Sequence, residues 1–337
     1  MNRLTATPAH CLKSLLVLSV LTSCATMEPR PEETALPSAP PDFTRLTDPG
    51  GCIIEQITTA AHDEYQVQGA SADGRLLSMA ARLKGATDAD STYQVFELDL
   101  ATGAKTDLSE KLQNSGPYSR DNRFIVTAQD TGNGKTDIFE YERATGALRV
   151  VASHDEWDWL PGYSPDGRYI VFNSYRVGGQ SDIHLYDKSD GSLVRLSEEP
   201  GYDAHAQFSP DGKRILYHRQ QGKREGGGYI FDLIVYELDS GQRTRLTNGL
   251  YEESYPAWAP DGQHIVFSSD NDGKPGRLNL YVLPPGGEPP RRLTHGDWKD
   301  SYAFWSHDGR YIYFNSDRAG ATNIYRMLMK GVDCEKP

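Results

Sequence analysis

Acidic, aromatic and histidine side chains recur at matching places between residues 154 and 300 of the sequence. Four acids each lie eight residues before an aspartate that sits in an Asp-Gly pair, and they are Asp158, Asp203, Glu253 and Asp300. Aromatic residues accompany them, namely Trp157, Trp159, Tyr202, Tyr251 and Trp298, and the same stretches contain His154, His205 and His295. Carboxylates beside aromatic platforms could receive a protein partner or a glycan. These residues are our candidates for a binding face, with His205 as the candidate histidine.

A structural role for the same acids competes with a binding role. Each repeat described below carries a basic residue in a later loop, and these residues are Arg82, Lys135, Arg176, Arg219, Arg277 and Arg318. Ion pairs between such residues and the acids are frequent in proteins without any function. We favour this structural interpretation for the acids. For the two tryptophans in His154–Pro161, exposure and packing remain open alternatives.

Metal and nucleophile chemistry have weaker signals. The histidines are dispersed without an H-x-x-x-H pair, and Asp130–Asp137 and Asp270–Gly273 resemble calcium loops without their full ligand spacing. Ser164 and Ser209 precede prolines in turns and have no nucleophile motif around them. We therefore predict no catalytic residue, no metal and no cofactor, which makes the protein non-enzymatic.

The turn aspartates belong to a hairpin that repeats along the chain. Tyr163–Phe172 reads as a strand, a tight Asp-Gly turn and a second strand. Six copies place the turn aspartates 48, 45, 45, 50 and 47 residues apart, at Asp73, Asp121, Asp166, Asp211, Asp261 and Asp308. Each copy continues into an alternating third strand and a short fourth one. Four-stranded sheets repeated radially form a propeller, so we predict an all-β, six-bladed β-propeller of antiparallel blades.

This strand order gives the two faces of the propeller different characters. The loops that join one blade to the next share a face with the loops between the second and third strands, around the mouth of the central channel. This loop face holds the candidate residues and the longer, more varied loops, including Arg219–Tyr229, which we expect to be a mobile rim. The Asp-Gly face has short, nearly identical turns.

The repeat S-P-D-G-[RK]-x-I, as in Ser164–Ile170, followed by R-L-[ST] as in Arg195–Ser197, resembles the propeller of the TolB family. The resemblance covers about residues 52–330 and implies a periplasmic propeller that binds a protein partner. The chain departs from TolB because a short tether, and no α/β domain, precedes the propeller. Peptidases with the same repeat carry an α/β-hydrolase domain, and no G-x-S-x-G occurs here.

Oligogalacturonate lyases of related fold supply an alternative function. The resemblance to them implies a carbohydrate-binding or carbohydrate-active propeller that uses channel histidines with a metal. A cluster of three or more His, Gln or Glu side chains around one channel point would favour it.

The N-terminal 23 residues have the pattern of a signal peptide. Arg3 and Lys13 precede the apolar run Leu15–Leu21, and Leu21–Cys24 resembles the lipobox of bacterial lipoproteins. This resemblance implies cleavage before Cys24 and acylation of its sulfur by palmitate-type chains, with sorting to the outer membrane because Ala25 follows. Residues 24–51 are rich in proline and are expected to form a disordered tether.

We therefore expect a monomer that is lipid-anchored at the periplasmic face of the outer membrane and holds an envelope protein. The formal net charge of −12 argues against nucleic-acid binding.

The sixth repeat stops after its third strand, so its fourth strand must come from the N-terminal side. Ile53–Thr58 and Phe43–Thr47 compete for the place beside Ile324–Met327. In three repeats the fourth strand ends 14 residues before the next turn aspartate, whereas the two candidates end 15 and 26 residues before Asp73. We therefore predict that Ile53–Thr58 closes the ring and that Phe43–Thr47 belongs to the tether.

Two cysteines remain once Cys11 and Cys24 are assigned to the signal peptide and the lipid. Cys52 opens the predicted closing strand, and Cys334 follows the last predicted strand. Both belong at the same end of one blade. We predict a Cys52–Cys334 disulfide, with a propeller over residues 52–334.

Overall fold

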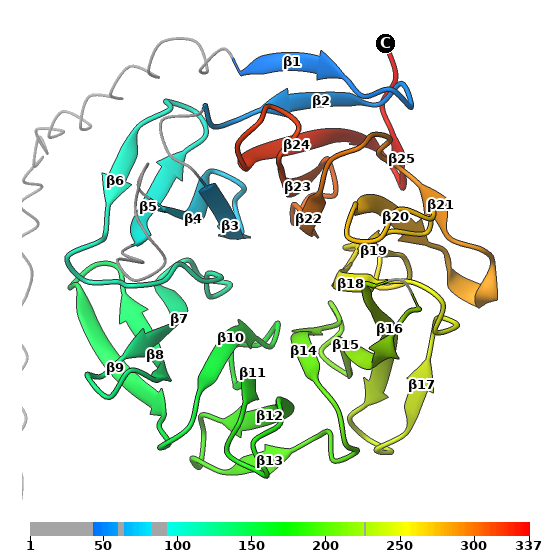
Figure 1. Cartoon of the computed structure of the whole chain (residues 1–337). Helices are drawn as coiled ribbons and strands as arrows, with labels where there is room; N and C mark the ends of the chain where they lie inside the picture. Colours follow the sequence, from blue (N-terminus) through cyan, green and yellow to red (C-terminus); the bar gives the residue numbers. More distant parts are fainter. Residues whose placement is uncertain (1–42, 60–63, 83–92, 226) are drawn as a thin grey trace, which may run out of the picture. The chain divides into compact units, whose positions relative to one another are not determined.

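Six antiparallel sheets surround a central channel in the computed structural model, which describes residues 43–59, 64–82, 93–225 and 227–337 (Figure 1). The predicted six-bladed propeller is therefore confirmed. Blades 1 to 3 contain the strands β3 (Glu64–Ala70), β4 (Leu76–Arg82), β5 (Tyr93–Asp99), β6 (Lys105–Asp107); β7 (Phe124–Asp130), β8 (Thr136–Glu142), β9 (Ala147–Ala152); β10 (Asp158–Tyr163), β11 (Tyr169–Ser174), β12 (Asp182–Asp187) and β13 (Leu193–Arg195).

Blades 4 to 6 complete the ring. Their strands are β14 (Asp203–Phe208), β15 (Arg214–Lys223), β16 (Tyr229–Glu237), β17 (Arg243–Arg245); β18 (Glu253–Trp258), β19 (Ile265–Ser269), β20 (Asn279–Leu283), β21 (Arg291–Arg292); β22 (Asp300–Trp305), β23 (Tyr311–Ser316), β24 (Asn323–Lys330), β2 (Ile53–Gln56) and β1 (Thr44–Thr47), with β25 (Asp333–Cys334) beside β24. A short 3-10 helix, η2 (Pro285–Gly287), follows β20. No helix in this part of the chain is long and apolar enough to cross a membrane.

The recurring serine and aspartate of the repeat hold each Asp-Gly turn. In blade 3 the hydroxyl of Ser164 donates to Asp166 Oδ1 at 2.5 Å and accepts the N–H of Tyr169 at 2.8 Å. Gly167 adopts a φ of 74°, a backbone region that a Cβ atom disfavours. The same Ser-to-Asp hydrogen bond occurs in blades 1, 2, 4 and 6. The repeated motif thus forms turns and is not itself a site.

The second strand of each blade is apolar on both faces because a neighbouring blade covers each side. In blade 3, Val171 packs with residues of blade 4, including Phe208 and Ile215. Its neighbours in sequence, Ile170 and Phe172, pack with residues of blade 2. Successive side chains of a strand point to opposite faces, so one apolar triplet serves two interfaces.

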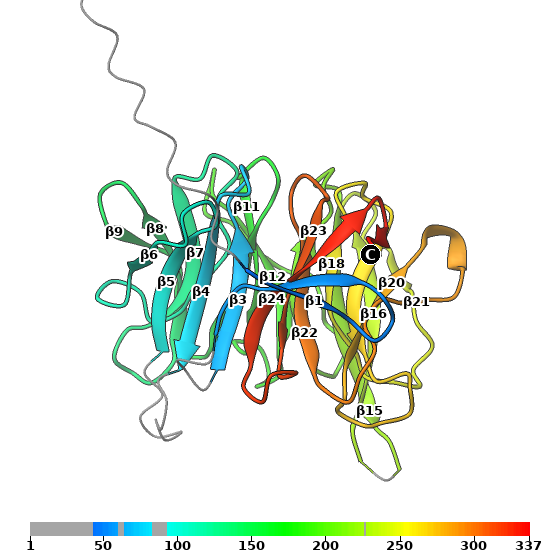
Figure 2. The same ribbon diagram turned by 90° about the horizontal axis from the view of Figure 1, so that it is seen from above.

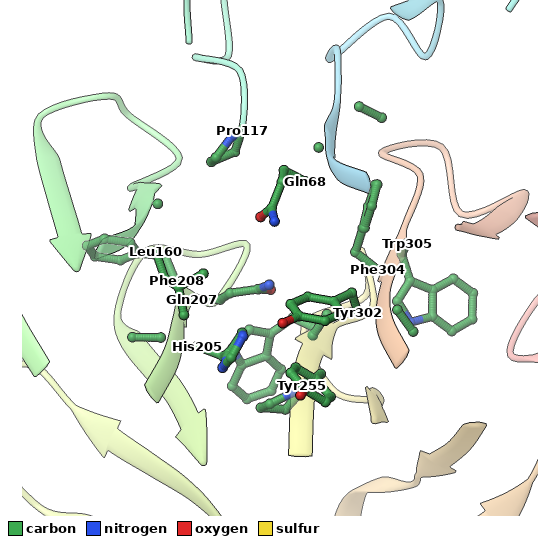
Figure 3. Close-up of a pocket in the computed structure, with 18 of the residues that line it drawn as sticks. Gln68, Pro117, Leu160, His205, Gln207, Phe208, Tyr255, Tyr302, Phe304 and Trp305 are labelled. Carbon is green, nitrogen blue, oxygen red and sulfur yellow. The ribbon is translucent and has the colours of Figure 1, made fainter. Parts of the chain in front are cut away.

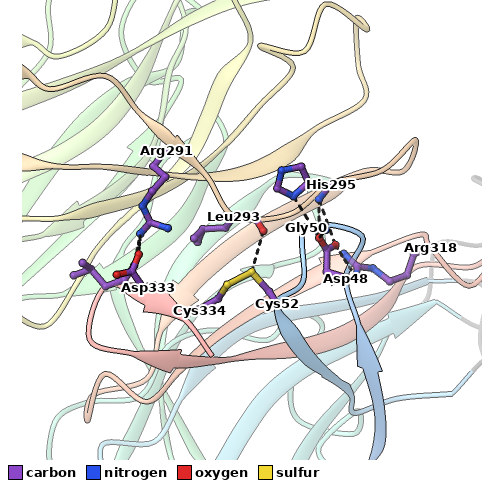
Figure 4. Close-up of a disulfide and its surroundings, with 10 residues drawn as sticks. Asp48, Gly50, Cys52, Arg291, Leu293, His295, Arg318, Asp333 and Cys334 are labelled. Atoms are coloured by element: carbon purple, nitrogen blue, oxygen red, sulfur yellow. Dashed lines mark hydrogen bonds and ion pairs between the residues drawn. A yellow bond between two sulfur atoms is a disulfide. The ribbon is translucent and has the colours of Figure 1, made fainter. Parts of the chain in front are cut away.

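The N-terminal strand β2 closes the ring in the predicted slot. It pairs antiparallel with β24, with Ile54 opposite Met327. Cys52 and Cys334 form the predicted disulfide, with their Cα atoms 5.4 Å apart (Figure 4). The disulfide therefore joins the N-terminal closing strand to the C-terminal end of blade 6.

The prediction that Phe43–Thr47 belongs to the tether is wrong. Thr44–Thr47 forms β1, which pairs with the outer edge of β2 (Figure 1). The turn between the two strands has a buried anchor, since the carboxylate of Asp48 accepts the backbone N–H groups of Gly50 and His295 and lies 3.6 Å from Arg318 (Figure 4). Blade 6 consequently has a fifth, outermost strand.

Blade 2 departs from the repeat at its innermost strand. This strand is reduced to a single bridge between Tyr118 and Ile125. Pro117 has no N–H to donate to β7, and side chains take over the hydrogen bonds, with the amide of Asn114 donating to the carbonyl of Ala128 at 2.9 Å. The worn motif of the second repeat therefore corresponds to a real irregularity of the blade.

Candidate functional site

Four residues of the innermost strands adopt left-handed backbone conformations at the same position of the repeat. They lie six residues before the turn aspartate, within a β-bulge of each strand, and they are Leu160 (φ 50°), His205 (57°), Tyr255 (53°) and Tyr302 (54°). Such a backbone costs a residue other than glycine about 1–2 kcal/mol. The bulge turns these side chains toward the channel, which all four help to line (Figure 3).

A cavity of about 270 Å³ occupies the half of the channel nearest the Asp-Gly turns. Its walls come from all six blades, and they are apolar or neutral along most of their length. Figure 3 shows Gln68, Gln207 and Tyr302 pointing into this space from different blades. The described lining contains no Asp, Glu, Lys or Arg. The cavity therefore suits an uncharged group that can exchange hydrogen bonds with amides.

Aromatic rings from blades 3 to 6 pack together beside the channel cavity. We call these rings the aromatic cluster, and its members are Trp159, Tyr175, Tyr202, His205, His218, Phe231, Tyr255 and Tyr302. Ring centroids lie 4.9 Å apart between His205 and His218, and 4.7 Å apart between His205 and Tyr255. The exposed Tyr229 extends the cluster to the rim, since its ring lies 5.9 Å from that of Phe231.

Burial favours the neutral form of the two histidines of the aromatic cluster. Burial lowers the pKa of His205 to about 3 and lowers that of His218 well below its ordinary value. Both ring nitrogens of His205 and Nε2 of His218 lack a hydrogen-bond partner among the described residues, while Nδ1 of His218 accepts the N–H of Tyr255 at 3.1 Å. Neutral imidazoles with free nitrogens can accept or donate one hydrogen bond to a ligand.

The structural interpretation of the acids holds in three blades. Asp158 pairs with Arg176 at 2.5 Å, Asp203 with Arg219 at 2.6 Å and Asp300 with Arg318 at 2.9 Å. All three carboxylates are buried. Burial raises the pKa of Asp158 and of Asp300 against the opposing effect of the arginines. These acids therefore lie inside the ends of the blades and do not form a ring of accessible carboxylates.

Two of the six expected basic partners pair elsewhere. Arg277 pairs with Asp317 at 3.5 Å instead of with Glu253. Lys135 pairs with Glu156 at 2.6 Å. Glu253 is left without an arginine. It lines a pocket between blades 4 and 5 together with Tyr251, so these two candidates lie apart from the channel.

The candidate tryptophans have three different environments. Trp157 is 45% exposed. Trp159 belongs to the aromatic cluster, with its ring 6.2 Å from that of Tyr202. Trp298 covers a buried ion pair, because its ring lies 4.8 Å from the Arg318 guanidinium and its Nε1 donates to Asp300 at 3.2 Å. Trp157 is thus the candidate aromatic residue that offers the most surface.

The segment Arg219–Tyr229 is mostly strand, which corrects our expectation of a loop. β15 and β16 pair as far as Lys223 and Tyr229, and the hairpin projects beyond the neighbouring blades (Figure 2). Arg219 is held by Asp203 and by Glu199 at 2.8 Å, and Arg224 pairs with Asp270 of blade 5. The rim is therefore braced against its neighbours by ion pairs.

The two segments that resemble calcium loops use their carboxylates within the protein. Asp130 accepts the N–H groups of Gly132 and Gly134, and Asp137 accepts the hydroxyl of Ser153. Asp270 accepts the N–H of Glu252 besides its pairing with Arg224. Within the described ranges, no group of three His, Cys, Asp or Glu side chains is arranged to hold a metal ion.

Sequence reasoning missed most of the aromatic cluster. His218, Phe231, Tyr255 and Tyr302 were not among the candidates, although Tyr255 and Tyr302 share the repeat position of His205. The acids were found by counting back eight residues from each turn aspartate. Counting back six residues as well would have found this position. His218 and Phe231 lie in β15 and β16, and their place in the cluster depends on the extended hairpin.

The fold and the channel define a six-bladed β-propeller with a neutral cavity at its centre. The family model of the TolB beta propeller domain matches residues 88–275 and 231–336. The chain therefore belongs to this family.

Known proteins resemble the chain in part or in fold. The uncharacterized peptidase YuxL of Bacillus subtilis (strain 168) is 33% identical over 67 residues, which span 20% of this chain and 10% of that protein. The structure of a putative TolB from Agrobacterium tumefaciens matches with a TM-score of 0.57 and 18% identity, over 80% of this chain and 91% of that chain. An oligogalacturonate lyase in complex with manganese matches with a TM-score of 0.56 and 16% identity, over 86% and 96%. The two structural matches show a shared fold.

Proposed function

We propose that the chain is a non-catalytic binding scaffold of the cell envelope that holds a protein partner on its loop face. One observation carries this proposal. Large exposed apolar side chains gather on the loop face of blades 3 to 5, where Trp157 is 45% exposed, Val177 38%, Tyr229 45% and Leu250 56%. The other described residues of this kind lie on outermost strands. Exposed aromatic and aliphatic anchors on one face mark protein interaction sites.

The rigidity of the scaffold supports the same assignment. The aromatic cluster and the buried Asp–Arg pairs lie directly beneath this face and fix the strands that carry its loops. A pre-ordered surface loses little conformational entropy when a partner binds. The loop face therefore combines apolar anchors with a firm base.

The proposed location rests on the cysteines. The Cys52–Cys334 disulfide fits an extracytoplasmic compartment. We extend this to residues 1–23 as a signal peptide and to a lipid on Cys24 that anchors the protein at the periplasmic face of the outer membrane. Both lie outside the described residues. The tether of this proposal spans residues 24–42, because β1 begins at Thr44.

Photo-crosslinking in cells tests the binding face. A photoreactive amino acid at Trp157 or Tyr229 should capture the same partner, identified by mass spectrometry, whereas one at Arg168 on the Asp-Gly face should not. With the photoreactive amino acid at Leu250 instead, the double variant Trp157→Ala/Tyr229→Ala should lose capture with an unchanged melting temperature because both side chains are exposed. Trp159→Ala is the matched control, and it should lower the melting temperature. Equal capture by the double variant and the wild type would place the partner elsewhere.

The channel cavity favours a second candidate function, the binding of a neutral carbohydrate. Gln68, His205 and Gln207 line one cavity, and aromatic residues line it with them. Uronic acids fit this cavity poorly because no cation lies in its described lining. A glycan array probed with the wild type and with Gln207→Ala decides the matter. Binding of a neutral glycan that is lost in the variant supports this function, and an array without signal counts against it.

A further inference from the structure

Blade 5 lacks an ion pair that occurs within blade 3 and within blade 6. In those blades the aspartate opposite the last serine of the second strand pairs with an arginine two residues beyond that serine. In blade 5 the same register places Glu253 opposite Ser269, and the arginine position is occupied by Asn271.

Hydrogen bonding confirms that these positions are equivalent. The backbone N–H of Asn271 donates to Ser269 Oγ at 3.1 Å, as the N–H of Arg176 does to Ser174 Oγ at 3.2 Å. Arg318 repeats this contact with Ser316 in blade 6. Blade 5 thus keeps the backbone arrangement and lacks the cation.

The carboxyl group of Glu253 is buried and incompletely satisfied. Glu253 is only 3% exposed, and its Oε2 has no hydrogen-bond partner among the described residues. Arg245 is the nearby cation that acts on Glu253, and it is already paired with Asp232 at 2.6 Å. Burial, with smaller contributions from Asp232 and Asp270, raises the pKa of Glu253 to about 7.

Asn271, which occupies the arginine position, lines a pocket of about 620 Å³ between blades 4 and 5. This volume lies within the range of small-molecule sites. Glu253, Asn271 and Tyr251 line it from the loop-face side, and residues 283–290, which include η2, line its outer side.

The charges around this pocket are predominantly negative. Its described lining holds Glu237, Glu253 and Glu288, with Arg214 as the basic residue. Arg214 is engaged by two other residues of the pocket wall, since its guanidinium lies 4.4 Å from the Trp258 ring and donates to the carbonyl of Gly262 at 2.8 Å. An incoming cation would therefore meet an unpaired carboxyl group and little repulsion.

We propose that the pocket between blades 4 and 5 binds an organic cation, a guanidinium or primary ammonium group, which takes the position that arginine holds in blades 3 and 6. The cation pairs with Glu253, and its organic part lies against Tyr251. This pocket is distinct from the channel cavity, although Trp258 lines both.

Isothermal titration calorimetry with a matched pair of probes tests the proposal. N-acetyl-arginine amide should bind the wild-type protein, and N-acetyl-citrulline amide, its uncharged isostere, should bind roughly tenfold more weakly or not at all. Agmatine distinguishes the source of the cation: tighter binding of agmatine indicates a free metabolite-like amine, and tighter binding of the acylated amide indicates an arginine of a peptide chain.

Variants assign the binding to Glu253. Glu253→Gln should weaken binding of N-acetyl-arginine amide roughly tenfold or more, and Asn271→Arg should abolish it by supplying the internal cation. The control Glu288→Gln removes a charge at the same pocket and should change the affinity less than about twofold, because this residue is exposed. Circular dichroism melting of each variant confirms that it is folded.

The pH dependence adds an independent readout. Affinity should be about tenfold higher at pH 8 than at pH 6, because the fraction of ionised Glu253 rises across this range. The charged groups that act on Glu253 or line the pocket are Asp232, Arg245, Asp270, Arg214, Glu237 and Glu288. Absence of binding to the folded wild type, or equal binding by folded Glu253→Gln, would overturn the proposal.

Discussion

Replacing Glu253 by Gln should remove a pH-dependent cost of folding. Burial raises the pKa of Glu253 from an ordinary value of 4.5 to about 7. Between these two pH values the folded protein keeps a proton that the unfolded chain has released, so the free energy of unfolding falls as the pH rises through this window. The difference of about 2.5 between the two pKa values corresponds to about 3 kcal/mol.

Urea unfolding at pH 5 and pH 8 measures this effect. Relative to the wild type, Glu253→Gln should gain about 2.5 kcal/mol of unfolding free energy on going from pH 5 to pH 8, because pH 5 already lies above the ordinary pKa of 4.5. The comparison of variant with wild type removes the opposite contribution of His205, whose lowered pKa makes the fold more stable as the pH rises. Glu288→Gln is the control and should show no such change. A difference between Glu253→Gln and the wild type that is the same at both pH values would refute the reasoning.

Three further predictions concern the disulfide, the lipid and a buried ion pair. Reduction of the Cys52–Cys334 disulfide opens a loop of 282 residues and should cost about 5 kcal/mol of unfolding free energy, measured by urea unfolding with and without reductant; an unchanged midpoint would contradict this. Cys24→Ala should move the protein from the membrane fraction to the soluble fraction, and unchanged fractionation would argue against an acyl anchor. Arg219→Met should cost about 3–5 kcal/mol because it leaves Asp203 buried without its cation, and the double variant with Asp203→Asn should recover most of this loss in the same assay.

The regular parts of the fold could be predicted because each is encoded locally and repeated. Ser164 and Asp166 form their turn through contacts within six residues, so the motif predicts the turn wherever it occurs. The spacing of Thr58 from the first turn aspartate identified the closing strand correctly. The spacing could not predict β1, because it addressed only which strand pairs with β24. The hydrogen bond from the His295 N–H to Asp48, which anchors the turn after β1, joins residues far apart in sequence.

The candidate site was harder to predict because side-chain direction depends on backbone details that the motif does not encode. The bulge in each innermost strand moves His205 into the channel, whereas Asp203, two residues earlier, is buried against Arg219. The pairing of acids with arginines was predictable in three blades because each carries an arginine in or just beyond its second strand. It failed for Glu253, since Asn271 occupies the arginine position and Arg277 lies further along a longer loop.

Closure of the ring by β2 also governs when the protein can finish folding. β2 and its cysteine leave the ribosome first, yet Cys52 and its partner Cys334 are 282 residues apart in the sequence, and β24 also lies near the C-terminus. At about 5–20 residues per second, synthesis of this interval takes about 15–55 s. During that time the strand edge that awaits β24 is open to pairing with other chains. Biogenesis of this propeller therefore includes a vulnerable interval that ends only when its last residues arrive.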